Sequence, residues 1–287
     1  MPRTREDRSA PKGGLPLNRI LAALPRTQLA RLAPSLERVA LETGEVLFDP
    51  DRPIKYVYFP EDCVASIVGI MADGSAVETA TVGREGMVGL PIFLGDGRTS
   101  LQAFCQVAGE ALRMDARKFR QELARGERLP ALLGRYTQAL IVQIGQSSAC
   151  NRLHPLRQRC ARWLLQTRDR VRSDTFALTH QFLSQMLGVR RTTVTELAGE
   201  FEREGLIKNH YGRIVVLDRD GLERTACECY GIIQREFERL LEGRESPSPL
   251  RSVRVSEGGK SVVREGVPRA EGEETIGSHK QPRPGRR

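Results

Sequence analysis

The spacing of apolar residues divides the chain into segments of different secondary structure. Residues 17–36 hold two short helical patterns that Pro25 and Pro34 interrupt. From about residue 39 to residue 115, short apolar or alternating runs are separated by glycine-containing turns and lie roughly 8 to 12 residues apart, which predicts a β-sandwich or barrel. Helical spacing returns at residues 115–127 and in a longer run over 129–153.

The long run carries an apolar stripe in which residues recur every three or four positions. Its members are Leu129, Leu133, Tyr136, Leu140 and Ile144. Such a repeat fits the seam between two helices of a coiled coil. We therefore expect Leu133, Tyr136, Leu140 and Ile144 to contact a second copy of the chain; the alternative is a helix packed on its own domain.

A new helix is expected over residues 155–171, and two shorter helices then follow. Thr179 is a good N-cap for the first short helix, over 180–187, and Gly188 supplies a turn with positive φ. Gly205 ends the second short helix. The second helix places four apolar residues on one face, namely Val194, Leu197, Ala198 and Phe201. Two short helices joined by a glycine turn predict a helix-turn-helix.

The remaining ordered part is expected to be a hairpin and a last helix. "LIKNHYGRIVVLD" predicts two strands around the Tyr211-Gly212 turn. Asp220 can cap the last helix. That helix has an apolar stripe made of Leu222, Ala226, Cys229, Tyr230, Ile233, Phe237 and Leu240.

The second short helix begins with two arginines. Cations at a helix N-terminus oppose the helix dipole, so an anionic partner there would resolve the conflict. Arginine also reads the guanine edge in DNA. We therefore expect the outward face to contact bases through Arg190, Arg191, Thr192, Thr195 and Glu196. The alternative is the solvated face of a structural helical hairpin.

Composition agrees with a DNA-binding protein. The 287 residues carry a net charge of +9, which favours an anionic partner. No apolar run has transmembrane length and no signal peptide is evident, so a cytoplasmic protein without membrane contact is expected. Residues 1–16 and a basic tail over 243–287 are expected to be disordered. The domain boundaries expected between them are 17–127, 128–153, 154–224 and 225–242.

These features together resemble those of a known protein family. The β-rich first half, the long helix and "LTHQFLSQMLGVRRTTVTELAGEFEREGLIKNHYGRIVVLD" are similar to the Crp/Fnr family of bacterial transcription regulators. The resemblance implies an α+β fold: a jelly-roll sensor domain of the cyclic-nucleotide-binding type, a dimerisation helix and a winged helix-turn-helix. It also implies a homodimer on two-fold symmetric double-stranded DNA, with RNA polymerase as a candidate further partner.

The resemblance suggests roles for individual residues. Arg191 occupies the place of the arginine that reads guanine in the family, whereas Thr192 and Glu196 replace the usual glutamate and second arginine, and Arg190 replaces a capping serine. A different operator sequence is therefore expected. Family positions that contact phosphate are matched by Thr179, His180, Gln181, Thr193, His210 and Arg213. Lys208 on the hairpin can also reach phosphate.

The resemblance also locates a candidate effector pocket. "MVGLPIFLGDGRTSLQA" aligns with the cassette that holds a cyclic nucleotide in the family. Gly89 matches, but Leu90 replaces the glutamate that accepts from the ribose; Arg98, Thr99 and Ser100 could supply the phosphate half. Because Leu90 cannot accept a hydrogen bond, we expect no cyclic nucleotide and no other cofactor.

Other classes of function find less support. The six cysteines form no CxxC pair, and Cys227-x-Cys229 offers too few ligands for a closed zinc site, so core packing and no metal are expected. The sequence contains none of the motifs of a serine hydrolase, P-loop enzyme or zinc protease, so no enzyme is expected. The remaining alternative is a cyclic-nucleotide-binding regulatory module of a non-transcriptional system, which would leave the helix-turn-helix without a role.

Overall fold

A computed structural model describes residues 15–242 and two short strands in the C-terminal tail, β11 (Val253–Val255) and β12 (Ser261–Val263). These strands pair antiparallel, so the prediction of a wholly disordered tail is wrong for them. Each of these strands contains two valines, a residue type that favours strand pairing. The predictions for residues 1–14 and for the rest of the tail lie outside the described residues.

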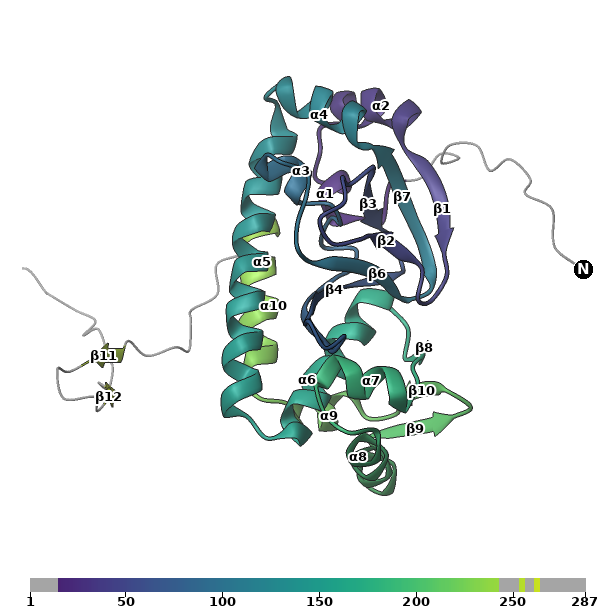
Figure 1. Ribbon diagram of the computed structural model, residues 1–287, viewed down its shortest axis with the longest axis vertical. Helices are drawn as coiled ribbons and strands as arrows, with labels where there is room; N and C mark the ends of the chain where they lie inside the picture. Colours follow the sequence, from purple (N-terminus) through teal and green to yellow (C-terminus); the bar gives the residue numbers. More distant parts are fainter. Residues whose placement is uncertain (1–14, 243–252, 256–260, 264–287) are drawn as a thin grey trace, which may run out of the picture. The chain divides into compact units, whose positions relative to one another are not determined.

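The first half of the chain forms two antiparallel sheets preceded by short helices (Figure 1). The helices are α1 (Arg19–Ala22), α2 (Arg26–Leu32) and a 3-10 turn, η1 (Ala33–Ser35). One sheet has the order β1-β7-β3, with β1 (Glu37–Leu41), β7 (Gly109–Asp115) and β3 (Tyr56–Pro60). The other has the order β2-β6-β4-β5, with β2 (Val46–Phe48), β6 (Gln102–Val107), β4 (Val64–Ile70) and β5 (Ala76–Val82). The predicted sandwich is confirmed.

Helices from later in the sequence close the apolar core of this sandwich. The short α3 (Pro91–Leu94) and α4 (Ala116–Ala124) precede the long α5 (Arg128–Leu153), which lies along the molecule in Figure 1. Asp115 caps α4 by accepting from two backbone amides. Phe119 of α4 and Leu133 and Tyr136 of α5 are buried together with residues of both sheets. The long helix is therefore part of the core of the N-terminal β-sandwich.

The second half forms a compact helical domain with a small sheet. It contains α6 (Leu156–Val171), α7 (His180–Leu187), α8 (Arg191–Arg203) and a sheet of order β8-β10-β9. The strands are β8 (Thr175–Ala177), β9 (Ile207–His210) and β10 (Arg213–Val216). Among the described helices none has the length and apolar character needed to span a membrane.

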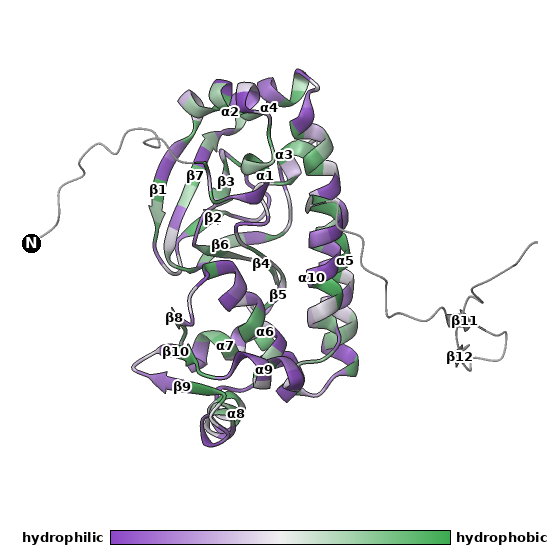
Figure 2. Ribbon diagram, turned by 180° about the vertical axis from the view of Figure 1, so that it is seen from behind, coloured by the Kyte–Doolittle hydropathy of each residue, from purple (hydrophilic) through white to green (hydrophobic). Residues whose placement is uncertain are grey.

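The last helical segment differs from the prediction. It is two helices, α9 (Arg219–Thr225) and α10 (Cys229–Glu242), separated by Ala226 in extended backbone. Asp218 caps α9 through its side chain, which accepts from the Gly221 amide, so Asp220 is not the cap. Because of this break, α10 can leave the helix-turn-helix and return along α5 (Figures 1 and 2).

The return of α10 corrects the predicted dimer seam. Leu133, Tyr136 and Leu140 are at most 8% exposed because they face the chain's own core, and the Tyr136 ring lies 6.3 Å from that of Phe237 on α10. Their assignment to a contact with a second copy is wrong. Ile144, 38% exposed, is the one predicted seam residue that still reaches the surface of this chain.

A buried ion pair joins the two domains and α5. The Arg170 guanidinium of α6 lies 2.7 Å from the Glu85 carboxylate, which follows β5, and both side chains are at least 92% buried. Arg170 also donates to Gln143 of α5, and Gln143 donates to the backbone oxygen of Thr81. Burial opposes ionisation of Glu85, but Arg170 and two backbone amides outweigh it and hold the pKa of Glu85 below its usual range.

A second polar contact between the domains surrounds Glu78 on β5. One carboxyl oxygen accepts from the Trp163 indole of α6, and the other lies 2.7 Å from the Ser66 hydroxyl. That hydroxyl also lies 2.7 Å from Gln106 Oε1 and has one proton to donate. Both contacts are satisfied when Glu78 is protonated and donates to Ser66. Burial raises the pKa of Glu78 to about 7, in agreement with this pattern.

Removing the charge of Arg170 should destabilise the folded protein strongly. Arg170→Met leaves Glu85 buried without its partner, which is expected to cost about 3–5 kcal/mol of unfolding free energy in urea. Arg168→Met is the matched control, because Arg168 pairs with Asp174 at the surface; its expected cost is about 0–1 kcal/mol. Equal losses for the two variants would contradict the assigned role of Arg170.

Glu78 should make stability depend on pH. Its pKa in the folded protein lies above the unfolded value, so its contribution is complete below about pH 4.5 and is lost as pH rises through about 7. Glu78→Gln keeps both hydrogen bonds without a charge. The parent loses this contribution as the pH rises, and the variant does not. We therefore expect the unfolding free energy of the variant, relative to that of the parent, to increase by on the order of 1–3 kcal/mol from acidic pH to pH 8. The same difference in unfolding free energy between the two proteins at every pH, measured by urea denaturation, would contradict this prediction.

Candidate nucleic-acid interface

The local sequence of α7 and α8 produces a helix-turn-helix. Thr179 caps α7 by accepting from the Phe182 amide at 3.1 Å, and Gly188 ends it at φ +66°. The first helix buries Leu183 and Met186. The second helix buries the four predicted residues, Val194, Leu197, Ala198 and Phe201. Gly205, at φ +71°, directly follows the last turn of α8. The predicted motif is confirmed.

The opposite face of α8 is open to solvent. Arg190, Arg191, Thr192, Thr195 and Glu196 are all exposed. Arg190 occupies the N-cap position without a side-chain capping bond, and the first turn of α8 contains no acidic residue. Within the described part of the chain, the Arg190 and Arg191 side chains have neither a hydrogen bond nor a salt bridge. Two unneutralised cations therefore stand at the positive end of the helix dipole.

His180 has a different place from the one expected. Its Nδ1 lies 3.0 Å from the Thr195 hydroxyl, and its Nε2 is hydrogen-bonded to the Asn209 side chain on β9. Burial and the nearby Arg191 charge lower the pKa of His180, which keeps the ring neutral. Both ring nitrogens are thus used inside the protein. His180 supports α8 and the hairpin, whereas the resemblance had implied a phosphate contact.

Thr195 is held by the same network. Its hydroxyl donates to the Arg191 carbonyl at 3.0 Å, as well as lying against His180. The hydroxyl is therefore oriented by the protein before any ligand arrives. Sequence reasoning did not identify Asn209, because its contact with His180 joins residues 29 positions apart.

The β9–β10 hairpin extends beside α8 and carries three of the expected phosphate contacts, Lys208, His210 and Arg213. Tyr211 and Gly212 both have positive φ, as a two-residue type I′ turn requires. Tyr211 is 93% exposed at the tip, against the ring of His210; the sequence analysis had treated it only as a turn residue. Exposed side chains on or near this surface are Thr179, Gln181, Thr193, Lys208, His210 and Arg213.

The residues of the expected effector cassette differ in their burial. Leu90 is buried in the sensor core, whereas Arg98 and Ser100 are exposed and Thr99 accepts from the backbone of Leu101. Gly89 has φ +100°, and a Cβ there would lie 3.3 Å from the backbone of Val57. The packing of the backbone alone accounts for this glycine.

One group of potential metal ligands lies where α5 ends and α10 begins. Cys150, His154, Cys227 and Cys229 place their ligand atoms within 4.8 Å of one another. The sequence analysis identified Cys227 and Cys229 but not their proximity to the end of the long helix, since more than 70 residues separate the two pairs.

Two family models match the two halves of the chain. Residues 38–125 match the cyclic nucleotide-binding domain, and residues 158–225 match the Crp-like helix-turn-helix domain. Among curated proteins, the transcriptional regulator SdrP of Thermus thermophilus is 46% identical over 48 residues. That segment is 17% of this chain and spans about a quarter, 24%, of the relative.

Solved structures of similar fold extend over most of the described residues. FixK2 from Bradyrhizobium japonicum has a TM-score of 0.57 at 16% identity, covering 67% of this chain and 98% of its own. The regulator CLP of Xanthomonas campestris, described as c-di-GMP responsive, has a TM-score of 0.55 at 14% identity, covering 68% of this chain and 100% of its own. At these identities the likeness concerns the fold.

Proposed function

The chain belongs to the Crp/Fnr family of bacterial transcriptional regulators, and from that membership we propose that it binds two-fold symmetric DNA as a homodimer under control of its N-terminal domain. The observation that carries the proposal is the open face of α8. It offers Arg190 and Arg191 at the helix N-terminus, with no acidic side chain in the first turn. A helix of this kind enters the major groove with its N-terminal residues at the base edges.

We propose distinct roles for the exposed residues. Arg191 has the reach and the free guanidinium to read guanine, and Thr192 and Glu196 extend the same face. Thr195 is fixed by His180, so its contribution is shape and one oriented hydroxyl. Lys208, His210 and Arg213 on the hairpin are suited to phosphates, as are Thr179, Gln181 and Thr193 beside the two helices.

We propose a new seam for the homodimer on the outer face of α5. Its exposed residues recur every three or four positions: Gly134, Gln138, Ile141, Gly145 and Ser148. Ile141 is 63% exposed at the centre of this stripe, and Ile144 borders it. A Cβ added at Gly134 or Gly145 would meet no described atom within 4 Å. The stripe therefore combines the repeat of a coiled-coil seam with room for a close partner helix.

We propose that the N-terminal domain does not respond to a cyclic nucleotide bound by the segment that contains Gly89, Leu90 and Arg98. A ribose hydroxyl beside Leu90 would lose its hydrogen-bond acceptor, and Leu90 already packs in the sensor core. The hydrogen bonds Arg170–Glu85 and Trp163–Glu78 connect the N-terminal domain to α6, so a conformational change in that domain can be transmitted to α6.

Arg191→Ala should reduce specificity as well as affinity. Loss of a bidentate base contact is expected to cost about 1–3 kcal/mol and to relax preference at one base pair of each half-site. Binding-site selection from random DNA, followed by titration of the selected site, measures both effects. Lys208→Ala is the control for a phosphate contact. It should weaken binding to all DNA sequences equally and reduce the slope of log affinity against log salt concentration by about 1. The same uniform weakening in Arg191→Ala would contradict base reading.

Ile141→Asp should convert the homodimer into a monomer, because a carboxylate in the apolar centre of the seam would be desolvated against its partner helix. Light scattering measures the mass, and titration with a two-fold symmetric site should show loss of tight binding. Leu217→Asp is the control, since Leu217 is similarly exposed, 58%, outside α5. A dimeric Ile141→Asp variant would refute the stripe as the interface.

A further inference from the structure

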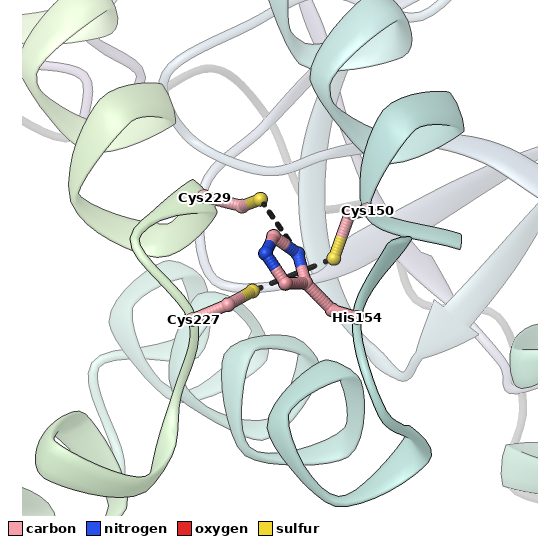
Figure 3. A group of neighbouring side chains, drawn as sticks. All are labelled: Cys150, His154, Cys227 and Cys229. Atoms are coloured by element: carbon pink, nitrogen blue, oxygen red, sulfur yellow. Dashed lines mark hydrogen bonds between the residues drawn. The ribbon is translucent and has the colours of Figure 1, made fainter. Parts of the chain in front are cut away.

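Three thiols and an imidazole converge where α5 ends. Cys150 is in the last turn of α5, and His154 directly follows the helix as its C-cap. Cys227 lies in the connection between α9 and α10, and Cys229 is the first residue of α10. In Figure 3 the three sulfur atoms and the imidazole ring point toward one another from these two separate parts of the chain.

The separations within this Cys₃His cluster fit one small ion. The Sγ atoms of Cys150 and Cys227 are 3.4 Å apart, and Cys229 Sγ lies 3.4 Å from His154 Nδ1. All four ligand atoms lie within 4.8 Å of one another. Tetrahedral Zn²⁺ with Zn–S bonds of about 2.3 Å requires sulfur atoms about 3.8 Å apart. Only small side-chain rotations are needed to reach that geometry.

Neighbouring side chains are placed as a metal site requires. Glu228 Oε1 lies 3.3 Å from His154 Nε2 and can accept a hydrogen bond from the Nε2–H group, which leaves the Nδ1 lone pair directed at the three sulfurs. The Gln146 amide donates to Cys229 Sγ at 3.2 Å, a bond that a thiolate strengthens. The imidazole tautomer and one sulfur are thus set by the protein.

Apolar packing does not account for the cluster, contrary to the sequence expectation. Cys150, Cys227 and Cys229 are at most 5% exposed and form a small group apart from both large hydrophobic cores. Cys63, Cys105 and Cys160, in contrast, are members of those cores. Burial raises the pKa of Cys105 and of Cys160 to about 12, as expected of inert core thiols.

We propose that Cys150, His154, Cys227 and Cys229 bind one Zn²⁺ ion per chain in a closed structural site. Four protein ligands complete a tetrahedron, with no position left for a substrate. The three thiols release their protons to solvent as the thiolates bind. The ion fastens the start of α10 to the end of α5, immediately before α6 begins.

Metal analysis of the purified full-length protein tests the site directly. Protein expressed in zinc-supplemented medium should contain one equivalent of zinc by plasma mass spectrometry. Replacement by Co²⁺ should give the d–d bands of a tetrahedral ion and a thiolate charge-transfer band. Stoichiometric iron in place of zinc, the absence of stoichiometric metal, or a Cys150–Cys227 disulfide as the resting state would overturn the proposal.

Variants locate the site and control for misfolding. Cys227→Ser should lose the zinc, whereas Cys160→Ser, at a buried cysteine of the helical domain's core, should keep it. Glu228→Ala removes only the partner of His154 and is expected to weaken zinc binding about 10- to 100-fold without changing the stoichiometry at saturation. Zinc retained by Cys227→Ser, or unchanged affinity in Glu228→Ala, would overturn the assigned ligands. These measurements involve no DNA, so their outcome is separate from that of the proposed function.

Discussion

The buried pair of Arg170 and Glu85 is the contact on which the arrangement of this protein depends. Two charges removed from water are tolerated only when their geometry is nearly complete. Here the guanidinium donates to the carboxylate of Glu85, which follows β5, to the amide oxygen of Gln143 on α5 and to a carbonyl of its own helix. The β-sandwich, the long helix and the helix-turn-helix domain therefore meet at one set of hydrogen bonds. A shift of α6 would leave a buried charge unpaired.

The two faces of α5 differ in their surroundings. Its inner face buries Leu133, Tyr136 and Leu140 against the sandwich and α10, and so contributes to the stability of the single chain. The outer face keeps Ile141 at the surface between two glycines. Substitution on the inner face, such as Leu140→Asp, would therefore test folding and not association. The outer face is the part of the helix that a second copy can reach.

The local features of this fold could be predicted from the sequence, and the long-range ones could not. The cap at Thr179, the turn at Gly188 and the buried face of α8 depend on residues a few positions apart, and all are confirmed. The predicted seam on α5 is wrong because α10 covers its apolar face, and the contacting residues Tyr136 and Phe237 are far apart in the sequence. The role of His180 and the Cys₃His cluster depend on contacts of the same long-range kind.

The positions of these contacts also indicate how a signal could reach DNA. The helix α6 starts one residue after Pro155, next to the Cys₃His cluster, and its last turn contains Arg170. Trp163, between them, donates to Glu78 of the sensor sheet. Hydrogen bonds of Trp163 and Arg170 thus hold α6 to the β-sandwich at its middle and in its last turn, so α6 cannot pivot without breaking one of them. Burial raises the pKa of Glu78 to about 7, so its carboxyl group can gain or lose a proton near neutral pH. A change in the β2-β6-β4-β5 sheet that reorients β5 would act there first. Helix α7 would follow because it packs on β5 and α6, and α8 would follow because it packs on α7.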